Sequence, residues 1–133
     1  MALTHLADTD VCIQFLKKKN PALSTRFRAH RHRFAVSDVT VFELFSGAEN
    51  YEDRPRRRAT IEEFLAIVDV VALDTRAARR AGEIQGQLSR IGQRIGSFDV
   101  LIAGISLTRG LILATNNLRE FSRVPDLQIE QWD

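Results

Sequence analysis

Short apolar runs alternate along this chain with longer segments whose apolar residues recur at helical spacing. The runs predict five strands: Leu3–Ala7, Phe34–Val36, Val70–Leu73, Leu111–Ala114 and Leu127–Glu130. The longer segments predict helices over 11–18, 21–32, 39–50, 56–67, 75–91, 99–108 and 118–121. This alternation predicts an α/β fold, with a short, mainly parallel central sheet and helices on both of its faces. The length of 133 residues suits a single domain over 1–133.

Four acidic residues stand at the edges of these apolar runs. Asp8 follows the first strand, Glu43 lies inside the 39–50 helix, Asp99 opens the 99–108 helix, and Glu120 comes soon after the fourth strand. Carboxylates are costly to bury alone, so several at such edges suggest a shared cation. Ligands of parallel sheets bind beyond the carboxyl ends of the strands, where Asp8 is expected. Ligation by oxygen alone favours Mg²⁺ or Mn²⁺ over zinc.

Each of these acids also has a structural interpretation. Asp8 could cap a turn or a helix, and Asp10 is more plausible as the N-cap of the 11–18 helix than as a ligand. Asp99 would gain from the dipole of its helix, and Glu120 could be an exposed residue of a short helix. Glu43 is harder to explain this way, because its helical neighbours are small and partly apolar.

Residue types that other kinds of site require are missing or misplaced. All the lysines stand at 17–19, which excludes the late lysine of a haloacid-dehalogenase phosphatase or a response-regulator receiver. No Gly-Lys pair of a P-loop and no Gly-x-Ser-x-Gly elbow occurs. Cys12 is the only cysteine, so neither an intrachain disulfide nor a cysteine zinc cluster is possible. The three histidines, His5, His30 and His32, show no metal-ligand spacing.

Basic residues are concentrated in two parts of the chain, although the formal net charge is only +2. From Val11 to Ser37 there is no acidic residue. Two such clusters beside an acidic site favour a ligand with a phosphate backbone over a merely solvated helix face. The candidate RNA contacts are Lys17, Lys18, Lys19, Arg26, Arg28, Arg54, Arg56 and Arg57.

Two further patterns concern packing and location. Gly82 and Gly86 are four residues apart in the 75–91 helix, and this spacing predicts close packing against another helix. No apolar run approaches the roughly 18 residues that cross a membrane, and no signal peptide is evident. We therefore expect a cytoplasmic protein without a membrane partner.

Four motifs together resemble those of PIN-domain ribonucleases, specifically VapC-type toxins of bacterial toxin–antitoxin pairs. Leu6–Cys12 is similar to the opening Leu-Asp-Thr-Asn-x-Cys of that family, and Val39–Glu49 to its Glu-Leu-x-x-Gly-Ala-Glu helix. Ile95–Gly104 is similar to its Ile-Gly-x-x-Asp-x-x-Ile-Ala segment, and Leu113–Phe121 to its closing Thr-Asn-Asn-x-x-Glu-Phe. The resemblance covers almost the whole chain, with the motifs in the family's order.

The resemblance assigns roles to individual residues. It places the family's metal-binding acids on Asp8, Glu43 and Asp99. It leaves two candidates for a fourth catalytic group, Asn117 and Glu120. The matching hydroxyls, which could orient carboxylates or bound water, are Thr9 and Thr115. Asp10 stands where the family usually has asparagine, which adds a charge near the site.

The resemblance also implies a function. It implies a hydrolase that cleaves RNA with Mg²⁺ or Mn²⁺, in several members at tRNA anticodon loops, and so stops translation. Members usually form homodimers, and a VapB-type antitoxin blocks the site, often with a basic side chain. The antitoxin complex commonly represses its own operon, so contact with DNA is expected only through that complex. Two alternatives stay open: a non-catalytic PIN-like module that binds RNA or protein, and a nuclease acting on single-stranded DNA.

Overall fold

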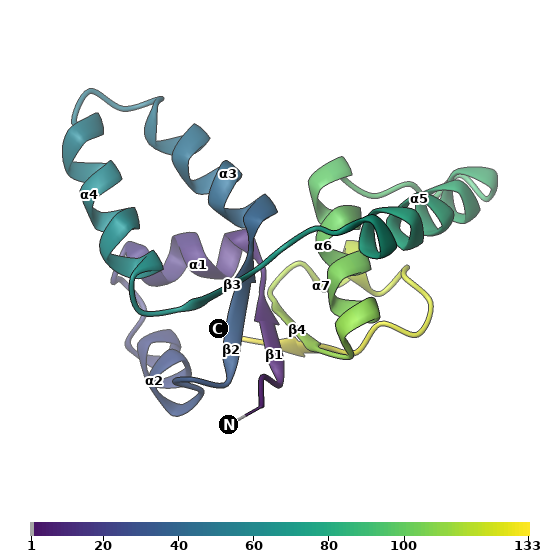
Figure 1. Ribbon diagram of the computed structural model, residues 1–133, viewed down its shortest axis with the longest axis horizontal. Coiled ribbons are helices and arrows are strands. Elements are labelled where there is room, and N and C mark those ends of the chain that lie inside the picture. Colours follow the sequence, from purple (N-terminus) through teal and green to yellow (C-terminus); the bar gives the residue numbers. More distant parts are fainter. Residues whose placement is uncertain (1) are drawn as a thin grey trace.

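The computed structural model describes residues 2–133, and every predicted strand and helix forms in the predicted order (Figure 1). Their ends differ from the predicted ones by at most three residues. The elements are β1 (His5–Ala7), α1 (Thr9–Leu16), α2 (Pro21–Ala29), β2 (Phe34–Ser37), α3 (Asp38–Ala48), α4 (Arg54–Leu65), β3 (Asp69–Val71), α5 (Thr75–Arg90), α6 (Ser97–Arg109), β4 (Ile112–Thr115), α7 (Leu118–Phe121) and β5 (Ile129–Gln131). Within these residues no helix is both long and apolar enough to cross a membrane.

The five strands form one sheet in the order β3-β2-β1-β4-β5. Every pairing is parallel, so the expected mainly parallel sheet is fully parallel. The chain runs outward from β1 through β2 to β3 and then returns to β4 on the other side of β1. The strand order therefore reverses between β1 and β4, and the carboxyl end of this pair is where open parallel sheets bind ligands.

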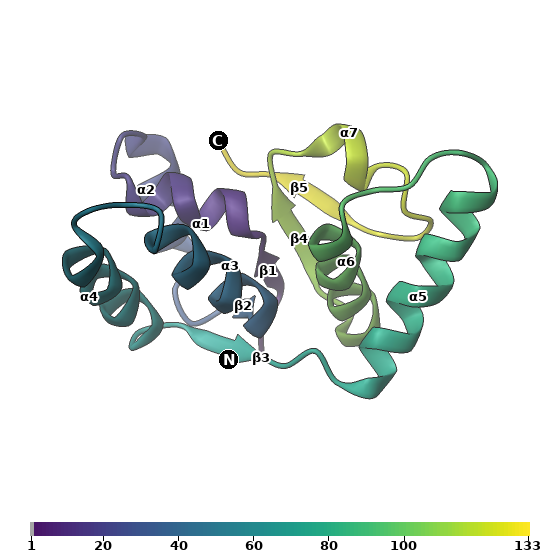
Figure 2. The ribbon, with the colours of Figure 1, turned by 90° about the horizontal axis from the view of Figure 1, so that it is seen from above.

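Helices cover both faces of the sheet, as predicted (Figure 2). Successive residues of a strand point to opposite faces. Leu6 and Leu113 accordingly pack with apolar residues of α5 and α6, whereas Ala7 and Ala114 pack with those of α1 to α4. The central strands β1, β2 and β4 are buried on both faces, which explains why they are short apolar runs without alternation.

The cap of α1 differs from the expected one. Asp8 is extended (φ −73°, ψ 171°), and its Oδ1 accepts a hydrogen bond of 2.8 Å from the backbone N–H of Val11. Asp10 lies in the first turn of α1 and is exposed. The prediction that Asp10 caps this helix was wrong, because the helix begins at Thr9, two residues earlier than predicted, and Asp8 is its N-cap.

The close packing of two helices occurs at a glycine other than the two predicted ones. A Cβ atom on Gly82 would have no neighbour within 4 Å, and one on Gly86 would meet only the end of Arg90. The prediction that Gly82 and Gly86 mark close packing against another helix was wrong. On Gly104 of α6, by contrast, a Cβ would lie 2.6 Å from the carbonyl oxygen of Ala77 and 2.9 Å from the Cβ of Ala81. Gly104 is therefore the residue that lets α6 approach α5.

Candidate active site

Asp8 is fixed at the point where β1 and β4 end side by side. Its backbone N–H donates to the carbonyl of Ala114 at 3.0 Å, and its Oδ2 accepts a hydrogen bond of 2.5 Å from the hydroxyl of Thr115. Together with the bond from Val11, these contacts hold a carboxylate that is only 3% exposed. The hydroxyl of Thr115 also accepts from the N–H of Asn117 at 2.9 Å, so it links Asp8 to the segment after β4.

Glu43 reaches the same place from α3. The hydroxyl of Thr9 donates to its Oε1 at 2.6 Å and lies 2.9 Å from the hydroxyl of Thr40. Thr9 and Thr40 are both buried. Ser37 donates its own hydroxyl toward Thr40 at 3.5 Å and caps α3. A line of hydroxyls thus orients Glu43, and Thr40 is a member that the sequence motifs did not indicate.

Asp99 and Glu120 meet on the opposite side, from α6 and α7. Glu120 Oε2 accepts from the side-chain amide of Asn117 at 2.7 Å, and its Oε1 accepts from the N–H of Gly96 at 3.3 Å. The carboxyl group of Asp99 interacts directly with that of Glu120. Between the two candidates for a fourth group, Glu120 thus faces the other acids, and Asn117 holds it in place.

Burial and like charge shift the pKa values of these carboxyl groups. Burial raises the pKa of Asp8 from 3.8 to about 6, against the hydrogen bonds from Thr115 and Val11, which lower it. Burial also raises the pKa of Asp99 to about 7, and the negative charges of Glu120, Asp8 and Glu43 raise it further. The hydrogen bond from Asn117 holds the pKa of Glu120 below its usual value. Carboxyl groups with pKa values raised in this way favour a cation among them.

The donor set suits a divalent cation of the magnesium type. The side chains that converge offer carboxylate oxygens and hydroxyls, and Cys12 is buried with a thiol pKa well above its ordinary value. The carboxylates are loosely spaced: among residues 2–133, three possible ligand atoms come within 4.8 Å of one another only elsewhere, at His5, His30 and Glu130. A loose set of acids fits Mg²⁺, which usually keeps several water ligands and takes one or two carboxylates directly.

A groove leads away from Glu43 between α1, α3 and α4. It encloses about 440 Å³ and joins Glu43 to basic residues of both predicted clusters, Lys17, Arg56 and Arg57. Arg57 is held by Asp53 at 2.8 Å and lies 3.5 Å from the ring centre of Tyr51. Arg56 is exposed and faces the groove. Part of the basic surface is therefore continuous with the acidic site.

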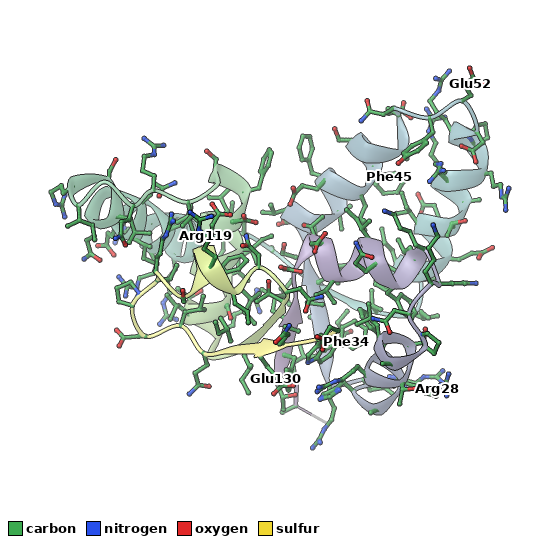
Figure 3. All side chains as sticks on the ribbon, turned by 180° about the vertical axis from the view of Figure 1, so that it is seen from behind. Arg28, Phe34, Phe45, Glu52, Arg119 and Glu130 are labelled. Atoms are coloured by element: carbon green, nitrogen blue, oxygen red, sulfur yellow. The ribbon has the colours of Figure 1, made fainter. Side chains whose placement is uncertain are left out.

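The other predicted RNA contacts lie apart from this groove or at its rim. Lys18 and Lys19 are exposed just beyond α1, and Arg54 donates to the carbonyl of Tyr51 at 3.4 Å. Arg28 is exposed on α2 (Figure 3). Arg26, also on α2, lies 3.7 Å from the carboxylate of Glu130. The structure thus places some candidate RNA contacts in or beside the groove and others on α2.

Two exposed phenylalanines beside the acids were missed in the sequence. Phe42 and Phe98 are 56% and 44% exposed, and their ring centres are 5.4 Å apart. Each directly precedes an acid of the cluster, Glu43 on α3 and Asp99 on α6. An aromatic residue next to each acid is a visible signal, but without the fold nothing shows that the two rings meet in solvent.

The model of one protein family, the PIN domain, matches residues 6–127. This chain belongs to the PIN-domain family. The predicted family is thereby confirmed, and the relatives identify the chain as VapC-type. The tRNA(fMet)-specific endonuclease VapC of Shigella flexneri is 41% identical over 130 residues, with 98% of each chain covered. Ribonuclease VapC2 of Haemophilus influenzae is 38% identical over the same length and with the same coverage.

A solved structure agrees with these relatives. The toxin–antitoxin complex VapBC from Salmonella typhimurium, crystallised bound to DNA, contains a chain that superposes with a TM-score of 0.94 at 39% identity. The match covers 98% of this PIN-domain chain and 99% of the other. The fold of a VapC-type PIN domain therefore extends over nearly all the described residues.

Proposed function

We propose that this chain is the toxin of a type II toxin–antitoxin pair, an endoribonuclease that hydrolyses phosphodiester bonds of tRNA and so inhibits translation. The observation that carries the proposal is the convergence of four carboxylates at the β1–β4 end of the sheet, with the pKa values of Asp8 and Asp99 raised. The name of the Shigella flexneri relative makes tRNA(fMet) the first substrate to test. Residues 1–133 would act as one PIN domain.

We assign the metal to Asp8, Glu43 and Asp99, with Glu120 as the fourth acid. Mg²⁺ or Mn²⁺ bound there would supply an activated water and stabilise the charge that develops on the phosphate. Asn117 acts by holding Glu120, through its amide at 2.7 Å. Thr9 and Thr115 orient Glu43 and Asp8 through hydroxyl bonds of 2.6 Å and 2.5 Å. These positioned carboxylates would hold the ion beside the phosphate that is attacked.

The RNA backbone would follow the groove that contains Lys17, Arg56 and Arg57. Cations along a backbone supply most of the affinity of a nucleic-acid complex without reading its sequence. The exposed rings of Phe42 and Phe98 give bases next to the cleaved phosphate an aromatic surface on which to stack.

The partners follow from the same likeness. The Salmonella typhimurium structure is a VapBC complex bound to DNA. We propose that a VapB-type antitoxin covers the site of this chain, that operon DNA is contacted only through that complex, and that the free toxin is a homodimer in the cytoplasm.

Cleavage of purified bacterial tRNA tests the function directly. The protein is incubated with initiator tRNA, with an elongator tRNA and with single-stranded DNA of the anticodon-loop sequence, each with Mg²⁺ and with EDTA. We expect discrete fragments from tRNA only, with Mg²⁺ only, and none from the Asp99→Asn variant. Cleavage of the DNA, or fragments that persist in EDTA or with the variant, would contradict the proposal.

A further inference from the structure

A second group of metal-ligating side chains gathers around the start of β1, on the face of the sheet that α2 covers. His5 begins β1, His30 caps the end of α2, and Glu130 is in β5. The strand register pairs Ala7 with Ala114 and Ala114 with Glu130. His5 is two residues before Ala7, so its side chain and that of Glu130 are on the same face of the sheet, the face that α2 covers. In Figure 3 Glu130 lies far from the α3–α4 tip that carries Glu52.

The three side chains come close enough together to be ligands of one ion. One ligand atom from each comes within 4.8 Å of the others. The Nε2 of His5 lies 3.3 Å from Oε1 of Glu130. Two ligands at about 2.0–2.1 Å from a tetrahedral zinc ion are themselves about 3.3 Å apart. The imidazoles of His5 and His30 meet edge to face, with ring centres 4.6 Å apart.

The hydrogen bonds of both imidazoles leave their Nε2 atoms free to accept an ion. The Nδ1 of His30 lies 2.9 Å from the carbonyl of Arg26, which can only accept, so Nδ1 carries the proton. The hydroxyl of Thr4 donates to the carbonyl of Arg33 and lies 2.7 Å from Nδ1 of His5, which assigns the proton of His5 to Nδ1 as well. An acceptor on the far ring nitrogen is the usual support of a metal-binding histidine.

The buried imidazole of His5 gives an independent indication that this cluster binds a ligand. Its side chain is buried, with 6% exposed, yet its Nε2 has no hydrogen-bond partner. With the proton on Nδ1, the neutral ring turns the lone pair of Nε2 toward the carboxylate of Glu130 at 3.3 Å, whereas a proton on Nε2 would be donated to that carboxylate and lower the pKa of Glu130. The indole N–H of Trp132 donates to the same carboxylate oxygen at 2.8 Å and fixes its position. A cation between these groups would remove the conflict.

We propose that His5, His30 and Glu130 bind a zinc-class transition-metal ion that fastens β5 to β1 and α2. Two imidazoles and a carboxylate are a typical three-residue zinc set, with water in the fourth position. Arg26, which is exposed, would release Glu130 from their 3.7 Å contact when the ion enters. His32 is close in sequence but exposed and outside the cluster. Sequence spacing alone indicated no histidine site, because the fold brings these ligands together from three distant segments.

The sole tryptophan reports on this site. Trp132 is fully buried, and its ring lies 4.6 Å from that of His30 and 5.4 Å from that of His5. The full-length protein, stripped of metal and held in excess Mg²⁺ to fill the acidic site, is titrated with ZnCl₂ and separately with CoCl₂ near pH 7.5. We expect a saturable change of tryptophan fluorescence with one ion per chain. At a hundredfold excess of zinc over Kd, Tm should rise by about 5–10 °C.

Two histidines of the same turn provide a matched comparison. His30→Asn should weaken zinc binding by at least about tenfold, the smallest effect typical even of losing a residue that only hydrogen-bonds to a metal ligand. Glu130→Gln should do the same, whereas His32→Asn, which suits the positive φ of 68° at that residue, should bind as the wild type does. Asp99→Asn should also keep full zinc affinity, which separates this site from the acidic one and from the proposed nuclease.

The proposal would be overturned by either of two results. One is a protein whose tryptophan fluorescence and Tm do not respond to zinc. That result would mean that a proton on Nε2 of His5, and not a metal ion, lies between His5 and Glu130. The other is equal zinc affinity in the wild type, His30→Asn and Glu130→Gln. Neither result depends on whether the protein cleaves RNA.

Discussion

Asp8 illustrates at the scale of one residue how the acidic site opposes the stability of the metal-free fold. Its pKa is raised from 3.8 to about 6 in the folded chain, mainly by burial. Between these two pH values the folded state holds a proton that the unfolded chain has released, so the free energy of unfolding falls as pH rises. The loss amounts to roughly 3 kcal/mol and persists above pH 6. Asp99, with a pKa of about 7, extends the window upward.

We therefore predict that Asp8→Asn stabilises the metal-free protein at pH 7.5 while it abolishes RNA cleavage. In EDTA its urea-unfolding free energy should exceed that of the wild type by up to about 3 kcal/mol, and the difference should vanish near pH 4. Mg²⁺ should raise the Tm of the wild type and not of the variant. Asp10→Asn is the comparison, because Asp10 is an exposed acid of the same helix turn whose charge makes only a minor contribution to the raised pKa of Asp8, so its removal should stabilise much less. Equal stability of Asp8→Asn and wild type at both pH values would contradict the argument.

At the scale of elements, the position of Asp99 depends on how closely α6 packs against α5. Gly104→Ala would place a methyl group 2.6 Å from the carbonyl oxygen of Ala77 and force the two helices apart. We predict a loss of about 1–3 kcal/mol in urea unfolding, the usual cost of overpacking. Gly82→Ala on α5 meets nothing within 4 Å and should be stabilising by about 0.5–1 kcal/mol. A destabilised Gly82→Ala with a neutral Gly104→Ala would refute this account of the helix pair.

The aromatic pair that joins α3 to α6 gives a second prediction at this scale. If bases of the substrate stack on the exposed rings, Phe98→Ala should lower kcat/KM for tRNA by roughly 5- to 100-fold, the equivalent of about 1–3 kcal/mol per stacked base. Ile91→Ala is the control, since Ile91 is 66% exposed in the loop before α6. Unfolding measured by circular dichroism should be unchanged in both. An unaffected kcat/KM in Phe98→Ala would exclude the stacking role.

The elements could be predicted from the sequence because their signals are local. Apolar runs such as Leu111–Ala114 and the proline at the start of α2 depend on neighbouring residues only. The acids at element edges also show locally, since a carboxylate beside a buried strand is conspicuous. What could not be predicted is long-range. The choice between Asn117 and Glu120 depends on Gly96, which lies in another loop, and Gly104 stands out only against α5.

The histidine cluster is the clearest case of this limit. His5, His30 and Glu130 have no common spacing in the sequence, and they meet because β1, β4 and β5 pair in one register while α2 covers that face. The prediction of the N-cap of α1 failed because it, too, depends on structure outside the helix. Both Asp8 and Asp10 suit an N-cap, and only the end of β1 decides where the helix begins.

At the scale of the whole molecule, the structure separates basic residues that the sequence presents as one RNA-binding set. Lys17 and Arg56 line the groove that reaches Glu43, whereas Arg28 projects from α2 (Figure 3). If RNA follows the groove, Arg56→Ala should raise KM for tRNA. It should also reduce the slope of log kcat/KM against log salt concentration by about 0.7–1, as expected for one lost phosphate contact. Lys17→Ala should act in the same way.

Arg28→Ala is the matched control for this path, because it removes one exposed arginine without touching the groove. Its KM and salt slope should equal those of the wild type, measured on initiator tRNA from low to physiological salt. The opposite result, with Arg28→Ala impaired and Arg56→Ala unaffected, would place the RNA across α2. The substrate would then cross the face that carries His5, His30 and Glu130, and zinc should inhibit cleavage; with RNA in the groove, zinc should leave the rate unchanged.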